Sequence, residues 1–237
     1  MPRTCQSPGF VFGSRYMERM TAIVPAFNEA PTIGRVIDVL RRSPLIGEVI
    51  VVSDGSTDHT ADVARRHGAR VLTLPVNVGK GFAVHYGARH AASSYVALFD
   101  ADLRHLRERH VRQLLGPVIR GQADVSVGLI DRGPFVMALS AYLPLLSGQR
   151  VLRRSLLLSL PLDIVEGYKI EAALNYVCDL HGARVKTVVL DGLTLRRKHE
   201  KIGIIRGAVA YITMGWDVLL SIVLVRFIYR TRTLTAS

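Results

Sequence analysis

Two aspartates stand one residue apart in this chain, Asp100 and Asp102, directly after an apolar stretch. Side by side, two carboxylates repel each other, and the end of a β-strand needs neither of them. In a turn that leaves a strand, both can approach one point. A hard divalent cation, Mg²⁺ or Mn²⁺, would relieve the repulsion there by taking carboxylate oxygens and completing its shell with phosphate oxygens and water. The alternative is structural, with one aspartate capping the next helix and the other solvated.

Apolar runs alternate with amphipathic stretches around this pair. Residues 48–54 read as a strand that is covered on both faces, because the run is largely apolar. The predicted strands are 21–27, 48–54, 69–75, 94–102 and 123–129, and the predicted helices are 31–42, 56–68, 79–92 and 108–121. This alternation at short spacing predicts an α/β fold with a doubly wound, mostly parallel sheet.

Two of the predicted helices have ends or interruptions that the sequence specifies. Ser56 or Thr57 is expected to cap the helix at 56–68, and Gly68 is expected to stop it. The dipeptide Gly116-Pro117 is expected to break the helix at 108–121, since proline lacks the amide hydrogen that a helix interior needs.

A polar or charged side chain follows each of the first four predicted strands. In doubly wound sheets, ligands bind beyond the carboxyl ends of the strands. Asp54 at such an end suits hydrogen bonds from a base or a ribose, and Lys80 suits a point charge for phosphates. The edge of the sheet that carries these side chains is called the rim. It favours a site for a cation and a diphosphate over a purely structural role for Asp100 and Asp102. The rim residues are Asn28, Glu29, Asp54, Asn77 to Lys80, Asp100 and Asp102.

Two other nucleotide-binding patterns are absent from the sequence. The segment after the first strand has a single, late glycine and no G-x-G-x-x-G. Gly79-Lys80-Gly81 has neither the spacing nor the hydroxyl residue of a phosphate-binding loop of the G-x-x-x-x-G-K-[ST] type. A dinucleotide-binding fold is therefore disfavoured.

Four ordered motifs resemble the nucleotide-binding half of family 2 type glycosyltransferases with the GT-A fold. They are "AIVPAFNEAPTIGRVI", "VIVVSDGSTDHT", "NVGKGFAVHYG" and "VALFDADL", and together they cover roughly residues 20–130. The resemblance implies transfer of a sugar from a nucleotide diphosphate sugar, a UDP- or GDP-sugar, with Mg²⁺ or Mn²⁺ as cofactor. The implied nucleotide-site residues are Pro25, Asn28, Glu29, Asp54 and Lys80, and the implied metal ligands are Asp100 and Asp102, the latter as a catalytic residue.

The second half of the chain resembles the acceptor side of two groups in this superfamily. "SGQR" at 147–150 and "EGYKIEAALN" at 166–175 are similar to segments of the polyprenyl-phosphate sugar synthases and of the glucosyl-phosphoglycerate synthases. Arg150 is a candidate contact for an acceptor phosphate. Glu171 is a candidate general base, or else a carboxylate stabilised at a helix N-terminus by the helix dipole. In the phosphoglycerate group a histidine after the last strand completes the metal shell, and His199 matches that place.

The last part of the chain is apolar and basic. Eight lysines and arginines lie between Arg196 and Arg232 against two acidic residues, so this segment carries +6 of the formal net charge of +12. Residues 207–225 contain a single charge, Asp217, and their length is at the threshold for a membrane span. Flanking arginines favour a basic amphipathic helix at a membrane surface. A helix packed on the sheet and a true span are the alternatives.

The domain organisation follows from these segments. We expect a loosely ordered extension at 1–19, a catalytic domain at 20–204 divided into a nucleotide-sugar half (20–130) and an acceptor half (131–204), and the C-terminal helix at 205–237. Two cysteines give no disulfide framework, and the N-terminus has no secretory signal. The expected location is the cytoplasm, at the inner face of the cell membrane.

The leading hypothesis is a metal-dependent sugar transferase that acts on polyprenyl phosphate at the membrane face. The alternative is a soluble transferase that acts on a small phosphorylated hydroxyl compound such as phosphoglycerate. A net charge of +12 also suggests nucleic acid as a partner. We find no basic face with interleaved aromatic residues and no groove-reading element, so the sequence argues against nucleic acid.

Overall fold

The computed structural model describes residues 10–12, 15–17, 19–130, 147–160 and 169–195, and every structural statement below applies to these residues. The predictions for His199 and for the C-terminal helix at 205–237 lie outside them. No helix in the described ranges is long and apolar enough to cross a membrane. Within the predicted extension, β1 (Phe10–Phe12) and β2 (Arg15–Met17) pair as a short antiparallel ribbon.

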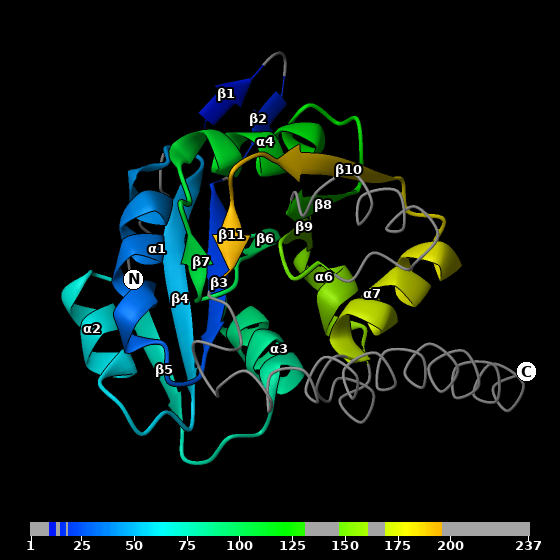
Figure 1. The fold of residues 1–237 in the computed structure, drawn as a ribbon. Helices are drawn as coiled ribbons and strands as arrows, with labels where there is room; N and C mark the ends of the chain where they lie inside the picture. Colours follow the sequence, from blue (N-terminus) through cyan, green and yellow to red (C-terminus); the bar gives the residue numbers. More distant parts are fainter. Residues whose placement is uncertain (1–9, 13–14, 18, 131–146, 161–168, 196–237) are drawn as a thin grey trace, which may run out of the picture.

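A seven-stranded sheet runs through the centre of the molecule (Figure 1). Its strands, in spatial order, are β10 (Val185–Leu190), β8 (Val125–Ile130), β9 (Arg150–Arg153), β6 (Tyr95–Leu98), β3 (Met20–Ala26), β4 (Ile46–Asp54) and β5 (Arg70–Leu74). All neighbours pair in parallel except β9, which is antiparallel to β6 and to β8. The predicted α/β fold with a mostly parallel sheet is confirmed, and the five predicted strands correspond to β3, β4, β5, β6 and β8.

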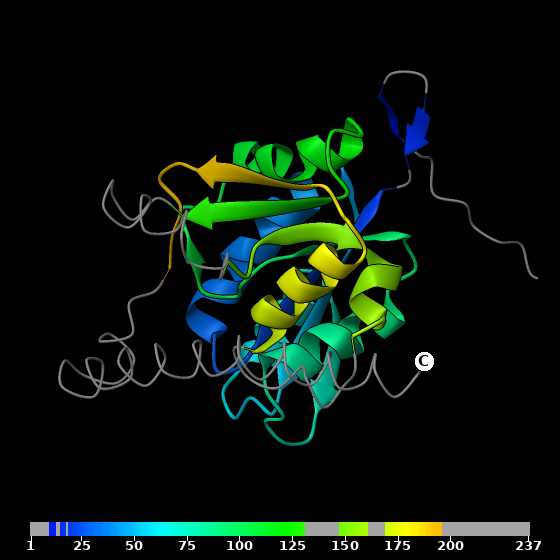
Figure 2. The ribbon, with the colours of Figure 1, turned by 90° about the vertical axis from the view of Figure 1, so that its right-hand side faces the viewer.

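Helices cover both faces of this sheet, which gives three layers (Figure 2). One apolar core lies under α1, α2 and α4, and a second core lies under α3, α6 and α7. The predicted apolar stripe of the first helix, Ile33, Val36, Ile37 and Leu40, is fully buried in the first core. The helices are α1 (Ala30–Arg42), α2 (Thr60–Arg66), α3 (Lys80–His90), α4 (Glu108–Ile119), α6 (Arg154–Leu158) and α7 (Lys169–Leu180).

Two predictions about helix ends and breaks are wrong. Helix α2 begins at Thr60 rather than at Ser56 or Thr57, because both of those residues hydrogen-bond to the loop that holds Asn28. Helix α4 continues through Gly116-Pro117 to Ile119. The residue before a proline usually resists helical geometry because its Cβ meets the proline ring, and a glycine has no Cβ.

Helix α3 packs closely on the sheet at Gly87. Its first residue, Lys80, lies at the strand ends. Gly87 faces the sheet in the middle of the helix, and a Cβ there would lie 2.7 Å from the Cγ2 of Ile23 and 3.1 Å from the Cγ2 of Val52. A larger residue at this position would push α3 away from β3 and β4. The glycine therefore allows α3 to pack closely on β3 and β4.

A small second ladder lies directly after the two aspartates. Strand β7 (Leu103–Arg104) pairs with β11 (Thr194–Leu195) in antiparallel fashion, with Leu103 opposite Leu195. The turn before β11 is fixed to α4, because the Nε2 atom of His110 lies 3.0 Å from the carbonyl oxygen of Asp191. The chain thus returns to the Asp102 turn at the end of its described part.

Candidate functional site

The carboxyl ends of β3, β4, β5 and β6 lie at one edge of the sheet, as the sequence predicts. Asp54 is the last residue of β4, Asn28 and Glu29 follow β3, and Asp100 follows β6 by two residues. Lys80 begins α3, which connects β5 to β6. Parallel strands bring these polar groups together because each strand ends at the same edge.

Asn28 and Glu29 hold the first rim loop against the second. Asn28 has a positive φ of 54°, and its Oδ1 accepts hydrogen bonds from the backbone N–H groups of Thr57 and Asp58 at 2.9 and 3.3 Å. Glu29 is buried at the start of α1, and its N–H donates to Thr60 Oγ1 at 2.8 Å. These contacts shape the place where the nucleoside is expected, and nucleoside binding by the two residues stays a prediction.

Asp54 anchors the segment that leads into α3. Its carboxylate is buried and accepts the N–H groups of Val78 and Gly79 at 2.8 and 2.9 Å. Both carboxylate oxygens are therefore engaged by the chain itself. The position of Lys80, one residue further on, depends on this anchor, while the predicted hydrogen bond from Asp54 to a base or ribose stays a prediction.

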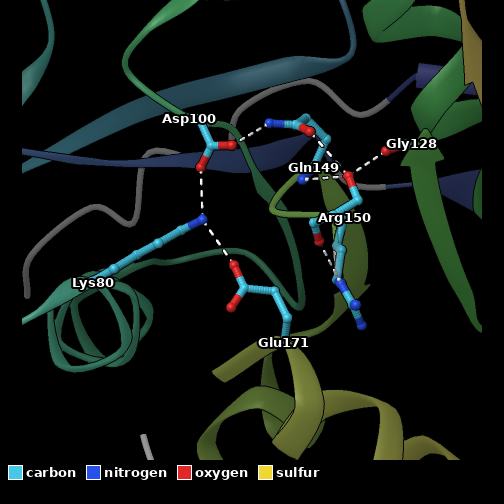
Figure 3. A network of polar contacts seen from close by, with 7 residues as sticks. Lys80, Asp100, Gly128, Gln149, Arg150 and Glu171 are labelled. Atoms are coloured by element: carbon cyan, nitrogen blue, oxygen red, sulfur yellow. Dashed lines mark hydrogen bonds and ion pairs between the residues drawn. The ribbon is translucent and has the colours of Figure 1, made fainter. Parts of the chain in front are cut away.

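Lys80 lies between two carboxylates that come from opposite halves of the chain (Figure 3). Its Nζ is 2.8 Å from Asp100 Oδ1 and 2.8 Å from Glu171 Oε1. Burial lowers the pKa of the Lys80 ammonium, but attraction to Asp100 and then Glu171 outweighs burial and raises that pKa well above its ordinary value. Lys80 is therefore a fixed positive charge at the strand ends.

The other oxygen of Asp100 is held by Gln149, which belongs to the segment SGQR at 147–150 and had no predicted role of its own. Gln149 Nε2 donates to Asp100 Oδ2 at 2.6 Å, and its Oε1 lies 3.0 Å from Ser147 Oγ, which also bonds to the Gly128 carbonyl (Figure 3). A carboxylate only accepts hydrogen bonds, so the amide nitrogen must face it. The signal in the sequence was the polar run 147–150 between apolar flanks.

Gly148 lets the two charged groups pack against the backbone. A Cβ at this position would lie 2.5 Å from Lys80 Nζ and 2.6 and 2.8 Å from the two Asp100 oxygens. Real Cβ atoms essentially never approach so closely. The Ser147–Gly148–Gln149 segment thus lies directly against the Lys80–Asp100 pair, and a larger residue at its centre would require the ends of these two side chains to move.

Glu171 and Arg150 form the floor of a small pocket beside this pair. The Glu171 side chain is 7% exposed, and its Oε2 has no hydrogen-bond partner among the described residues. The volume of the pocket is about 10 Å³, which is room for about one water molecule. Pro25, Phe99 and Asp100 also line the pocket. A buried carboxylate oxygen without a partner would be satisfied by a hydrogen bond from a hydroxyl or ammonium donor.

Arg150 is almost completely buried within β9. Its Nε donates to the Ser147 carbonyl at 2.9 Å, and its Nη1 donates to Asn175 Oδ1 at 2.7 Å. Burial lowers the pKa of Arg150, and nearby Glu171 partly offsets that effect. These contacts tie β9 to α7, so the geometry gives Arg150 a structural task, and its predicted contact with an acceptor phosphate stays a prediction.

The residues present fit a divalent cation. Asp102 lies half-buried in the turn two residues after Asp100, so the chain places two hard oxygen donors in the segment that follows β6. The described residues contain no group of three or more His, Cys, Asp and Glu residues that would complete a cage. Mg²⁺ is usually held by one or two carboxylates together with substrate phosphates, so two suffice. The Lys80 ammonium at 2.8 Å shows that the Asp100 carboxylate accommodates a cation.

Comparison with known proteins places this chain in one family. The model of the family "Glycosyl transferase family 2" matches residues 21–144, more than half of the chain. A 4,4'-diaponeurosporenoate glycosyltransferase from Staphylococcus aureus is 38% identical over 121 residues, which are 49% of this chain and 32% of that protein. The chain therefore spans about a third of the length of the curated relatives it matches.

Solved structures of glucosyl-3-phosphoglycerate synthase from Mycobacterium tuberculosis share the fold. The complex with Mn²⁺ and UDP-glucose has a TM-score of 0.65 and 30% identity, and the match covers 75% of this chain and 71% of that one. The complex with Mn²⁺, UDP-glucose and phosphoglyceric acid has a TM-score of 0.69 and 28% identity, and it covers 87% and 79% of the two chains. The expected GT-A architecture is confirmed by these neighbours.

Proposed function

Because this chain belongs to glycosyl transferase family 2, we propose that it transfers a sugar from a nucleotide diphosphate sugar to an acceptor, with Mg²⁺ or Mn²⁺ as cofactor. One observation carries the proposal. The Asp100 carboxylate stands at the end of β6, fixed on one oxygen by Gln149 and neutralised on the other by Lys80. A carboxylate held in this way, next to Asp102, is prepared for a cation and a diphosphate rather than for a cap.

The side chains of this site have distinct tasks in the transfer. Asp100 and Asp102 would hold the cation, which, when bound, stabilises the negative charge that builds on the departing diphosphate. Lys80 supplies a second positive charge beside the cation. The sugar carbon becomes positively charged as its bond to the diphosphate breaks. The Glu171 carboxylate faces the pocket and suits a hydroxyl of the sugar or of the acceptor.

The proposed donor is a UDP-sugar, with a GDP-sugar as the alternative. Structural neighbours were crystallised with UDP-glucose and Mn²⁺, which supports uridine. We propose that the nucleoside lies among Pro25, Asn28, Glu29 and Asp54. Pro25 is near the end of β3, Asn28 and Glu29 follow that strand, and Asp54 ends β4. We further propose that His199, four residues beyond the end of β11, joins the two aspartates on the cation.

The proposed acceptor carries a phosphate, and two compounds fit. A polyprenyl phosphate at the inner face of the cell membrane suits the segment 207–225 with its single charge and flanking arginines. Phosphoglycerate suits the structural neighbours, one of which was crystallised with phosphoglyceric acid. A lipid phosphate is already ionised and needs no general base, whereas a hydroxyl acceptor gains from one.

The donor site is tested by thermal shift with UDP-, GDP- and ADP-sugars, each with Mn²⁺ and with a chelator. We expect a Mn²⁺-dependent rise in Tm for UDP-sugars that is lost in Asp102→Asn and kept in Asp62→Asn, an exposed aspartate on α2. A rise that survives chelation and the Asp102 change would overturn the metal-dependent proposal.

The acceptor is tested by transfer of labelled sugar to polyprenyl phosphate in vesicles and to 3-phosphoglycerate in solution. Glu171→Gln then separates the two chemistries. If the lipid phosphate is the acceptor, this variant keeps a large part of the rate at saturating Mn²⁺, and removal of 207–237 abolishes transfer to the vesicles. If activity appears only with phosphoglycerate and disappears in Glu171→Gln, the membrane proposal is wrong.

A further inference from the structure

Lys80 occupies the position on Asp100 that the proposed function gives to a metal ion. Its Nζ is 2.8 Å from Asp100 Oδ1, within the range of a charge-assisted hydrogen bond. An ammonium and a divalent cation repel each other strongly at such distances in a partly buried site. The Asp100 side chain is 19% exposed, so water screens this repulsion only in part. Lys80 and a metal ion therefore compete for one carboxylate.

We propose that Lys80 is the resident cation of Asp100 in the free protein, and that a divalent cation displaces it from Asp100 onto Glu171. This inference rests on the proposed function, since it takes Asp100 as a metal ligand. It adds that Lys80 and Glu171 control how tightly the metal binds before any nucleotide is present. Glu171 is in this sense a positioning residue that acts through Lys80.

Glu171 is built to receive the whole ammonium group. Its Oε1 already accepts a hydrogen bond from Lys80 at 2.8 Å, and its Oε2 has no partner among the described residues. A lysine ammonium has three donors, so it can satisfy both oxygens of Glu171 once Asp100 binds another cation. The Lys80 side chain is one-third exposed and flexible, so a small rotation at its end is enough.

Asp100 is built to stay in place when Lys80 leaves. Gln149 holds Asp100 Oδ2 at 2.6 Å and is itself buried, with Ser147 next to its amide oxygen. On the opposite side, the Lys80 Nζ and the Asp100 oxygens fill the space above Gly148. The carboxylate thus keeps one fixed oxygen and exchanges the cation on the other.

The first test uses electron paramagnetic resonance to measure the affinity of the full chain for Mn²⁺ without nucleotide. We expect Lys80→Met to bind Mn²⁺ at least about tenfold more tightly than the wild type, equivalent to about 1.4 kcal/mol. Glu171→Gln should bind Mn²⁺ more weakly, because Lys80 then has no second carboxylate and stays on Asp100. Lys186→Met, an exposed lysine on β10 that bonds to Gln122, is the matched control and should change nothing.

A double-mutant cycle separates the exchange from a general effect of charge. If Glu171 acts through Lys80, Glu171→Gln should weaken Mn²⁺ binding much less in the Lys80→Met protein than in the wild type. Equal losses in both backgrounds would show that Glu171 contributes only its charge. That result, or an unchanged affinity in Lys80→Met, would overturn the inference.

A second readout follows Lys80 directly in the wild-type protein, and a variant is needed only to assign its signal. The lysine ammonium resonances of ¹⁵N-lysine-labelled protein are recorded during titration with Mg²⁺, with the Lys80 signal assigned from Lys80→Met. We expect this signal to shift in step with Mg²⁺ binding, and the Lys186 signal to stay. A bound Mg²⁺ with an unmoved Lys80 signal would contradict the displacement.

The same measurements distinguish failure of the inference from failure of the proposed function. If Asp100→Asn and the wild type both fail to bind Mn²⁺ and Mg²⁺ even when UDP is present, the metal site itself is wrong. If the wild type binds the ions and Asp100→Asn does not, while Lys80→Met binds no more tightly, the metal site stands. Only the role of Lys80 as resident cation is then refuted.

Discussion

Asp54→Asn tests whether the rim of the site depends on hydrogen bonds within the chain. The native carboxylate is 3% exposed and accepts the N–H groups of Val78 and Gly79 at 2.8 and 2.9 Å. Asparagine offers one acceptor oxygen, and its amide hydrogens face the second N–H group. One charge-assisted bond is lost and the other becomes a neutral one, which together amount to about 3 kcal/mol, because bonds to charged groups contribute about 1.5–3 kcal/mol each.

The assay for this variant is thermal and urea unfolding of the full chain. A loss of about 3 kcal/mol lowers Tm by about 6 to 12 °C in a protein of this size. Asp62→Asn is the control, since Asp62 pairs with Arg65 on the exposed face of α2 and should contribute only about 0.2–0.5 kcal/mol. If Asp54→Asn lowers Tm no more than the control does, the Asp54 anchor is not the source of rim stability and the reasoning is refuted.

Two further predictions concern buried polar side chains. Arg150→Met removes the donor to the Ser147 carbonyl and to Asn175 Oδ1; because a buried acceptor that loses its donor costs about 1–3 kcal/mol, urea unfolding should show a loss of at least about 2 kcal/mol, and an unchanged midpoint would contradict the structural task given to Arg150. Burial lowers the pKa of His110 below its ordinary value, so the unfolded chain takes up this proton first. The stability that neutral His110 contributes should therefore be complete above pH 6.5 and decline as the pH falls from there toward the lowered pKa. His110→Gln should remove part of that decline in unfolding midpoints measured at pH 7.5 and pH 5.5, about one unit on either side of the ordinary histidine value; an identical decline in both proteins would assign it elsewhere.

The elements and the rim could be predicted from sequence because their signals are local. The apolar stripe of α1 repeats at helical spacing, and β4 is an apolar run that ends at Asp54. Parallel topology then places the ends of β3, β4, β5 and β6 at the same edge, so the positions of Asp54 and Asp100 follow from chain order alone. The approximate location of the site needed no information about tertiary contacts.

The partners of the site residues could not be predicted because they come from distant parts of the chain. Lys80 meets Glu171 across 91 residues, and Asp100 meets Gln149 across 49 residues. Nothing in the spacing of the sequence indicates that Gln149 rather than Ser147 reaches Asp100. The start of α2 was misplaced for the same reason, since Asn28 from another loop engages Thr57.

Strand β9, which runs antiparallel to its neighbours in the described seven-stranded sheet, has a consequence for the order in which this protein is made. Strands β6 and β8 touch only through β9, so when synthesis has reached Ile130 both still have a bare backbone edge facing the missing strand. Such edges pair readily with other chains. The gap between β6 and β8 is filled only after residues 131–153 have left the ribosome and β9 has paired with both strands. A fragment limited to the family segment, 21–144, would therefore be an incomplete sheet prone to aggregation rather than an independent domain.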